Sequence, residues 1–205
     1  MNMRKLGYFS EFLLFPPLIL VATVFAFRSS TPPQPAIWAI VYGAGLGGWS
    51  LIEYVLHRVL FHHAPILSRI HERHHLSPQE LLGTPVWASA LLGLIAVATP
   101  AWIALGFGLG SAATAGLVTG YLWYVFVHYA THQLRPARGS YLYRARLRHG
   151  RHHYLSHSGN FGVTTDVWDH LFGTAIKGRT EARRYQSTVS RRVRNAADRR
   201  PRPVD

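Results

Sequence analysis

Long uncharged stretches limit what this chain can fold into more than any other feature. Three stretches reach the roughly 20 residues that a helix needs to cross a bilayer, and each carries at most one acidic, basic or histidine side chain: 36–56, 85–107 and 110–131. A fourth, 12–27, is shorter and contains Pro16 and Pro17. Because 205 residues include too little polar sequence to cover these stretches, we expect an all-α integral membrane protein. Its four predicted helical spans are 10–30, 36–56, 85–107 and 110–131.

The distribution of charge predicts how the spans are oriented. The chain has 22 Lys and Arg against 9 Asp and Glu, and most of the excess follows residue 132. The segment 57–84 carries several arginines, whereas the connection at 28–35 carries only Arg28. By the positive-inside rule, both termini and the 57–84 segment are expected in the cytoplasm.

The same pattern divides the chain into two parts. Residues 1–176 are interpreted as one membrane domain. Residues 177–205 lack apolar periodicity and are interpreted as a basic, disordered tail. Such a tail either meets anionic lipid or an acidic redox partner, or it is a solvated extension.

Histidine is the residue that carries the predicted chemistry. Ten of the 13 histidines fall into four groups: His57 and His62; His71, His74 and His75; His128 and His132; His149, His152 and His153. Positions three or four apart share a face of a helix, so the last three groups each project together. His57 and His62 are five apart, so we expect the helix to end or bend between them, or the two to reach metals from different directions.

An even number of crossings separates the groups, so all four lie on the cytoplasmic side. If they converge there, ten imidazoles could supply two metals with about five ligands each, in a histidine-rich cap outside the membrane. His63, His157 and His170 lie outside this pattern, and His157 is the strongest accessory candidate among them.

One group also fits a different motif. His71, Glu72 and His75 match H-E-x-x-H, in which two histidines bind zinc and the glutamate activates water in metalloproteases. H-x-x-H-H recurs at 149–153, however, and Gly150 occupies the glutamate position there. The repeated feature is three histidines, so the protease motif is interpreted as coincidental.

The chemistry of imidazole narrows the choice of metal. Imidazole suits zinc, copper, iron and nickel. A site built almost wholly from histidine at a membrane surface favours two iron ions that activate oxygen, with zinc as a substitute in a structure. A metal transporter would need ionisable residues along its spans, and the middle of every predicted span lacks them.

Three segments resemble the fatty acid hydroxylase superfamily, whose members are integral-membrane di-iron enzymes related to sterol desaturases. They are EYVLHRVLFH (53–62), RGSYLYRARLRHGRHH (138–153) and NFGVTTDVWDHLFGT (160–174). The last two are similar to fatty acid 2-hydroxylases in particular. The resemblance covers about residues 40–176. It implies a four-helix membrane base, a cytosolic cap that carries the histidines, and insertion of one oxygen atom into a lipid C–H bond.

The sequence also suggests residues that would hold the metal-binding histidines in place. A histidine that binds metal usually donates its other ring N–H to an acceptor. Glu53 lies one helical turn before His57 and is a candidate acceptor. Asp169, within the third resembling segment, is a candidate for the same role or for helix capping. His157 completes this set.

The resemblance also suggests partners and alternatives. Some members carry a fused b-type cytochrome domain, for which this chain has no room. A separate b-type cytochrome, or a ferredoxin with its reductase, is therefore expected to donate electrons, and the short chain suggests a protein of a bacterial inner membrane. The predicted substrate is a membrane lipid, with its acyl chain as the first choice, and no nucleic acid partner is expected. A lipid desaturase and a hydroxylase of sterol, carotenoid or aminolipid substrates remain alternatives.

Overall fold

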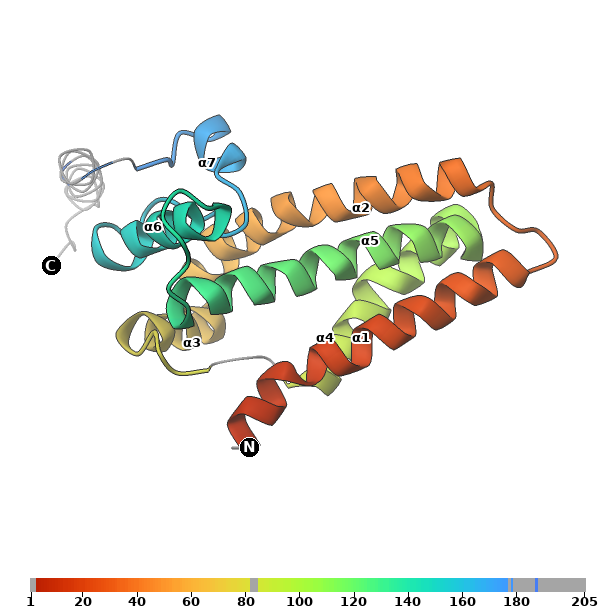
Figure 1. The fold of residues 1–205 in the computed structure, drawn as a ribbon, viewed down its shortest axis with the longest axis horizontal. Helices are drawn as coiled ribbons and strands as arrows, with labels where there is room; N and C mark the ends of the chain where they lie inside the picture. The colour runs from red at the N-terminus through yellow and green to blue at the C-terminus, as the bar shows by residue number, and fades with distance from the viewer. Residues whose placement is uncertain (1–2, 82–84, 177, 179–186, 188–205) are drawn as a thin grey trace, which may run out of the picture.

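Every regular element in the described part of the chain is a helix. The computed structural model describes residues 3–81, 85–176, 178 and 187. Its elements, where η marks a π-helix, are α1 Met3–Arg28, α2 Pro35–Val55, η1 Leu56–Phe61, α3 Pro65–Leu76, α4 Val86–Gly93, η2 Leu94–Ala98, α5 Thr99–Gln133, α6 Tyr141–Tyr154 and α7 Val167–Leu171. The long helices α1, α2 and α5 run lengthwise, and α3, α6 and α7 gather at one end (Figure 1). The predicted all-helical fold is confirmed for these residues.

Three helical stretches are long and apolar enough to cross a membrane: Gly7–Arg28, Pro35–Phe61 and Val86–Gln133. Large apolar side chains on them face outward. Leu13 is 75% exposed, Ile40 is 70% exposed and Ile103 is 81% exposed. An apolar surface of this extent is unfavourable in water and favourable against lipid chains.

The third stretch turns back on itself at Gly106. It has 48 residues, more than twice the roughly 20 that one crossing requires. Gly106 has φ 71° and ψ 167°, a backbone conformation that glycine tolerates best. Trp102 precedes this glycine and Ser111 follows it. The Trp102 indole donates a hydrogen bond to Ser111 Oγ at 3.2 Å, which joins the two arms. The sequence predicted a break between 107 and 110, and the structure places it at Gly106.

Glycine allows α2 and α5 to approach each other closely. A Cβ added to Gly45 would lie 2.5 Å from the carbonyl oxygen of Ala113, and one added to Gly116 would overlap the carbonyl oxygen of Tyr42. Small residues permit this contact between membrane helices. Gly43 lies in the same glycine-rich segment but has open space around it.

The end that carries α3 and α6 is shaped by local signals. Pro65 occupies the first turn of α3, where proline is well tolerated. The hydroxyl of Ser140 accepts a hydrogen bond from Tyr143 N at 3.1 Å and so caps α6. Apart from Gly178 and Ser187, the predicted tail at 177–205 lies outside the described residues.

Candidate metal centre

All ten histidines of the four sequence groups lie together at one end of the helices. They form two groups of five, within each of which one nitrogen per ring lies within 4.8 Å of all the others. The first group is His57, His62, His71, His75 and His152, and the second is His74, His128, His132, His149 and His153. We call them the first and second histidine groups. This is the division that two metals with five ligands each require.

The two H-x-x-H-H helices contribute to both groups. α3 gives its pair at positions i and i+4, His71 and His75, to the first group, and gives His74 to the second. α6 does the reverse. It gives its pair, His149 and His153, to the second group and gives His152 to the first. The groups are also in contact, because the rings of His75 and His153 stack with centroids 4.2 Å apart. The sequence predicted that each triplet shares a face but not that it is divided in this way.

A π-helix brings His57 and His62 together. The chain from Leu56 to Phe61 forms η1, whose hydrogen bonds join residues five apart rather than four. The two rings are therefore nearly parallel, with centroids 5.3 Å apart and an interplanar angle of 23°. We expected the helix to end or bend between these histidines, or the two to reach metals from different directions; the structure instead continues the helix as a wider π-helix.

The spacing of ring nitrogens fits a metal ion in each group. In the first group the Nε2 atoms of His71 and His75 are 2.9 Å apart, and those of His62 and His152 are 3.3 Å apart. In the second group the Nε2 atoms of His132 and His149 are 2.9 Å apart. Two nitrogens bound at right angles, each about 2.1 Å from an ion, lie about 3 Å apart.

Backbone carbonyls fix the orientation of two of the rings. His57 donates from Nδ1 to the oxygen of Phe161 at 2.6 Å, and His152 donates from Nδ1 to the oxygen of Gly159 at 2.9 Å. Because a carbonyl oxygen can only accept, the proton of each neutral ring lies on Nδ1. Each Nε2 therefore presents its lone pair to the centre of the first group, as a metal ligand must.

Glu53 holds the loop that supplies these carbonyls. Its side chain is 3% exposed. One carboxylate oxygen accepts from Val163 N at 2.6 Å and Thr164 N at 2.9 Å, and the other accepts from Thr164 Oγ1 at 2.6 Å. We predicted that it would accept from an imidazole, and its partners in the described structure are in the loop instead.

Asp169 holds the same loop from the other side. Its fully buried carboxylate accepts from Phe161 N at 2.9 Å, from Gly162 N at 2.8 Å and from Thr174 Oγ1 at 2.7 Å. Like Glu53, it meets loop groups where an imidazole was expected. Both acids therefore act on the histidines indirectly. They hold the loop, and the carbonyls of the loop accept hydrogen bonds from His57 and His152.

Burial keeps the rings neutral. Burial and neighbouring imidazoles lower the pKa of His75 to about 3, and burial lowers the pKa of His74 to about 4. For His149 and His152, burial and then the adjacent histidines hold the pKa well below its ordinary value. Neutral imidazole is the form that binds metal, so these residues are ready to do so at neutral pH.

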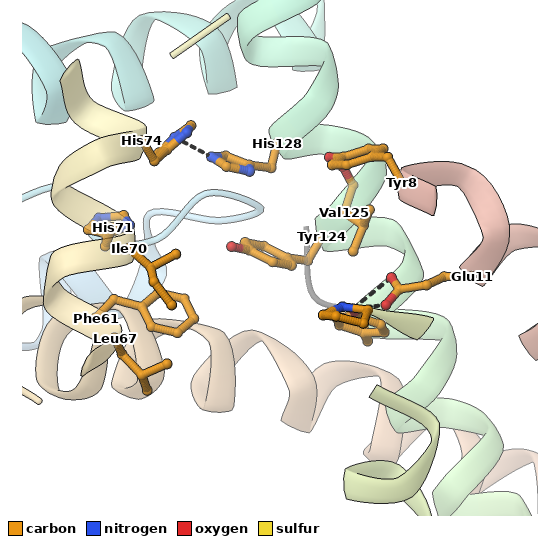
Figure 2. Close-up of a pocket in the computed structure, with 12 residues that line it drawn as sticks. Tyr8, Glu11, Phe61, Leu67, Ile70, His71, His74, Tyr124, Val125 and His128 are labelled. Carbon is orange, nitrogen blue, oxygen red and sulfur yellow. Dashed lines mark hydrogen bonds between the residues drawn. The ribbon is translucent and has the colours of Figure 1, made fainter. Parts of the chain in front are cut away.

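A cavity of about 370 Å³ opens beside the histidines. Figure 2 shows His71 and His74 on one side of it and Glu11 on the other. Its remaining walls are mostly apolar or aromatic: Tyr8, Phe61, Leu67, Ile70, Pro85, Tyr121, Tyr124 and Val125, with His128 at the top. The shape and polarity suit a lipid chain.

The other predicted candidates lie outside both groups. His157 is exposed, donates from Nε2 to the oxygen of His153 at 3.0 Å, and has its ring 4.3 Å from that of His75. His63 is exposed and bonds to main-chain oxygens of its own turn. His170 lies 3.8 Å from Asp166 at the surface.

The remaining acid in this region does not resemble a zinc-protease base. Glu72 is exposed on α3, whereas His71 and His75 face three further histidines. A residue that sequence reasoning missed is Glu11, which lines the cavity and is 4% exposed. The available signal was its position as an isolated acid next to the first apolar stretch.

Known proteins are similar to this chain in sequence and in fold. The family described as "Fatty acid hydroxylase" matches residues 42–174. The "Fatty acid 2-hydroxylase" of Macaca fascicularis is 35% identical over 144 residues, which cover 64% of this chain and 38% of that protein. The "Dihydroceramide fatty acyl 2-hydroxylase FAH2" of Arabidopsis thaliana is 31% identical over 176 residues, which cover 78% of this chain and 69% of that protein.

A solved structure has a similar fold. The structure described as "Full length scs7p (only hydroxylase domain visible)" matches with a TM-score of 0.72 at 23% identity, over 83% of this chain and 67% of that one. At this identity the likeness concerns the fold. The chain spans less than two fifths of the length of the macaque relative.

Proposed function

The chain belongs to the fatty acid hydroxylase family, and we propose that it hydroxylates the acyl chain of a membrane lipid at a di-iron centre. The observation that carries the proposal is the pair of five-histidine groups beside an apolar cavity. The histidines offer ligands for two metals, and the cavity offers a place for a chain of methylene groups. Relatives named as hydroxylases of fatty acids and of dihydroceramide acyl groups support a lipid substrate.

The residues of the site have separable roles in this proposal. The first and second histidine groups would hold one iron each. Iron bound there would supply the activation of O₂ and the insertion of one oxygen atom into a C–H bond. Gly159 and Phe161 orient two rings through their carbonyls, and the apolar walls exclude water and align the chain.

The carbon next to the acyl carbonyl is the proposed target, because the relatives are named as 2-hydroxylases. Electrons are proposed to come from a separate b-type cytochrome, or from a ferredoxin with its reductase. The basic tail is a candidate surface for an acidic donor. The bacterial origin that the short chain suggested stays a prediction.

We propose that the chain crosses the membrane four times. The reversal at Gly106 supports this, because each arm of the third apolar stretch is long enough for one crossing. An even number of crossings keeps the four histidine-bearing segments on one side. The excess of arginine in the segments around the histidines favours a cytosolic cap, with both termini in the cytoplasm.

Lipid mass spectrometry of a heterologous host, with and without the gene, tests the function. Acyl chains that gain the mass of one oxygen atom are expected, and the His152→Ala variant should abolish that product. Chains that instead lose two hydrogens would show a desaturase. Oxygen gained on a head group, a sterol or a carotenoid would show one of the other activities of the family.

A matched control separates the proposal from the protease alternative. Glu72 is exposed and lies outside both histidine groups, so the Glu72→Gln variant should give the same lipid product as the unmodified protein. Loss of product in Glu72→Gln, with product retained in His149→Ala, would contradict the di-iron proposal and favour a zincin.

A further inference from the structure

A second apolar cavity, of about 360 Å³, lies along two of the helices that line the first, α1 and α5, on the part of them farther from the histidines. We call the cavity beside the histidines the proximal cavity and this one the distal cavity. The distal cavity is lined from four elements: Phe15, Leu18, Ile19, Val21, Ala22 and Phe25 of α1; Ala90 and Gly93 of α4; Leu94 and Ala98 of η2; and Trp102, Phe107, Ser111, Thr114, Ala115 and Val118 of α5. Nearly all of these side chains are apolar, so a hydrocarbon chain would fit there.

Three polar side chains form a bridge between the two cavities. The Glu11 carboxylate accepts a hydrogen bond from Ser89 Oγ at 2.6 Å and from the Tyr121 hydroxyl, which is 2.7 Å from both carboxylate oxygens. The three residues belong to α1, α4 and α5. We call this arrangement the Glu11 bridge.

The order of residues along each helix places the bridge at the boundary. On α1, Glu11 lies between Tyr8 of the proximal cavity and Phe15 of the distal cavity. On α5, Tyr121 follows Val118 of the distal cavity by three residues and lines the proximal cavity itself. On α4, Ser89 directly precedes Ala90 of the distal cavity.

The chemistry of the bridge is unusual for its place. A carboxylate inside an apolar helical span is unfavourable unless donors satisfy it, and such residues commonly mark functional positions in membrane proteins. Here Glu11 is 4% exposed, and its carboxylate accepts hydrogen bonds from Ser89 on α4 and Tyr121 on α5. A polar group between two apolar cavities also opposes the passage of the methyl end of an acyl chain from one cavity to the other.

We propose that the Glu11 bridge is the end wall of the acyl-chain cavity and sets the longest chain that the protein accepts. This inference rests on the proposed acyl substrate. Tyr121 precedes His128 by seven residues on α5, which corresponds to about 10 Å along a helix. An acyl chain that begins at the histidines therefore meets the wall after about that distance. It can enter the distal cavity only when the wall is removed.

Photolabelling tests the wall in the unmodified protein. The probe is an octanoyl lipid with a diazirine at its methyl end, incorporated in vesicles with the protein and irradiated, and the labelled residues are mapped by mass spectrometry. Labels are expected on proximal residues such as Tyr8 and Val125. Labels on Phe15 or Val118 in the unmodified protein would overturn the proposal.

Two substitutions at one position then separate the wall from its neighbours. Glu11→Ala removes the carboxylate and is expected to raise the labelling of Phe15 and Val118 by a stearoyl probe at least fivefold. Glu11→Gln is the matched control, because its amide oxygen still accepts from Ser89 and Tyr121 and should keep the labelling proximal. Equal labelling in the two variants would contradict a wall formed by the bridge.

A third substitution tests the route itself. Val118→Phe fills the distal cavity, so in the Glu11→Ala background it should return the labels to proximal residues. If Glu11→Ala does not yield folded protein, Tyr121→Phe removes the hydrogen bonds that join the carboxylate to α5 while it keeps the ring, and a smaller shift in the same direction is expected. Distal labels that persist after Val118→Phe would show a different path and overturn the proposal.

Labelling does not require turnover, so this test is separate from that of the proposed function. A protein that makes no hydroxylated lipid but shows the shift retains the wall and loses the enzyme assignment. A protein that makes the product but shows no shift retains the activity and loses the wall.

Discussion

Each histidine of the two groups offers a single ring nitrogen, so the proposed metal binding depends on individual side chains. His152 and His153 are adjacent in sequence, yet the first belongs to the first histidine group and the second to the second histidine group. Neighbouring substitutions of the same kind therefore address different metals.

We predict that His152→Ala and His153→Ala each release about half of the bound metal, because each removes one ligand from one of two five-histidine groups. Elemental analysis of the purified variants measures the content. The His63→Ala and His157→Ala proteins should keep full content, since neither residue belongs to a group. Full metal content in His152→Ala would contradict the ligand assignment.

Asp169→Ala is expected to lower the free energy of unfolding by about 3 kcal/mol or more, because each of three buried donors loses its acceptor at roughly 1–3 kcal/mol. The donors are the N–H groups of Phe161 and Gly162 and the hydroxyl of Thr174. Chemical denaturation in detergent measures the change. Asp166→Ala serves as the control, because its contact with Arg148 is 3.8 Å long and half exposed, and such pairs contribute about 1 kcal/mol or less. Equal losses in the two variants would show that the loop does not depend on Asp169.

At this scale the sequence predicted the histidines but not what holds them. The spacing of three or four between histidines is visible in the printed chain, because it follows from helix geometry. The acceptors of His57 and His152 are main-chain carbonyls, and every residue has one, so no residue type marks them. Glu53 and Asp169 were recognised as important acids, but their partners could be found only in the folded loop.

Helices decide which side chains can meet. η1 makes a spacing of five equivalent to one turn, and the close packing of α2 on α5 places the two ends that carry His57 and His128 side by side (Figure 1). The glycines at that contact are therefore part of what positions the metal centre.

We predict that Gly116→Ala destabilises the protein by roughly 1–3 kcal/mol, the usual effect of overpacking, because its Cβ would overlap the Tyr42 carbonyl oxygen. Gly43→Ala is the matched control, since nothing lies within 4 Å of that position. The control should be neutral or more stable by up to about 1 kcal/mol, as alanine favours a helix more than glycine. Thermal unfolding of both variants in detergent measures the difference, and a Gly116→Ala protein as stable as Gly43→Ala would rule out a tight helix contact there.

The elements were more predictable than their contacts. Apolar length gave α1, α2 and the third stretch, and the glycine-rich break gave the reversal at Gly106 within a few residues. The π-helix η1 was not predicted, because residues 56–61 have ordinary helical composition and the widening of the helix depends on tertiary packing. The sequence is rich in glycine at Gly43, Gly45, Gly47 and Gly48, but only the tertiary arrangement shows that Gly45 makes the tight contact.

The whole molecule gathers ten imidazoles at one end, and this makes its stability depend on pH. Burial lowers the pKa of His62 and His74 from the ordinary 6.5 to about 4. Between these values the unfolded chain binds more protons than the folded one, so acid favours unfolding.

We predict that the metal-free protein has its full stability above about pH 6.5 and loses stability as the pH falls toward about 4, the window set by His62 and His74. Thermal unfolding across this pH range measures the loss. His62→Gln, which cannot be protonated, should reduce the slope. A melting temperature that does not change across the window would contradict neutral, buried rings.

The division of the H-x-x-H-H triplets has a consequence for biogenesis. Four members of the first histidine group are synthesised by residue 75, but the fifth, His152, follows the last apolar stretch. Of the second group only His74 is synthesised early, and its other four members lie at residue 128 or later. Neither five-membered set exists until the ribosome has passed both halves of the chain, so complete metal loading is a late event that follows insertion of the last hydrophobic segment.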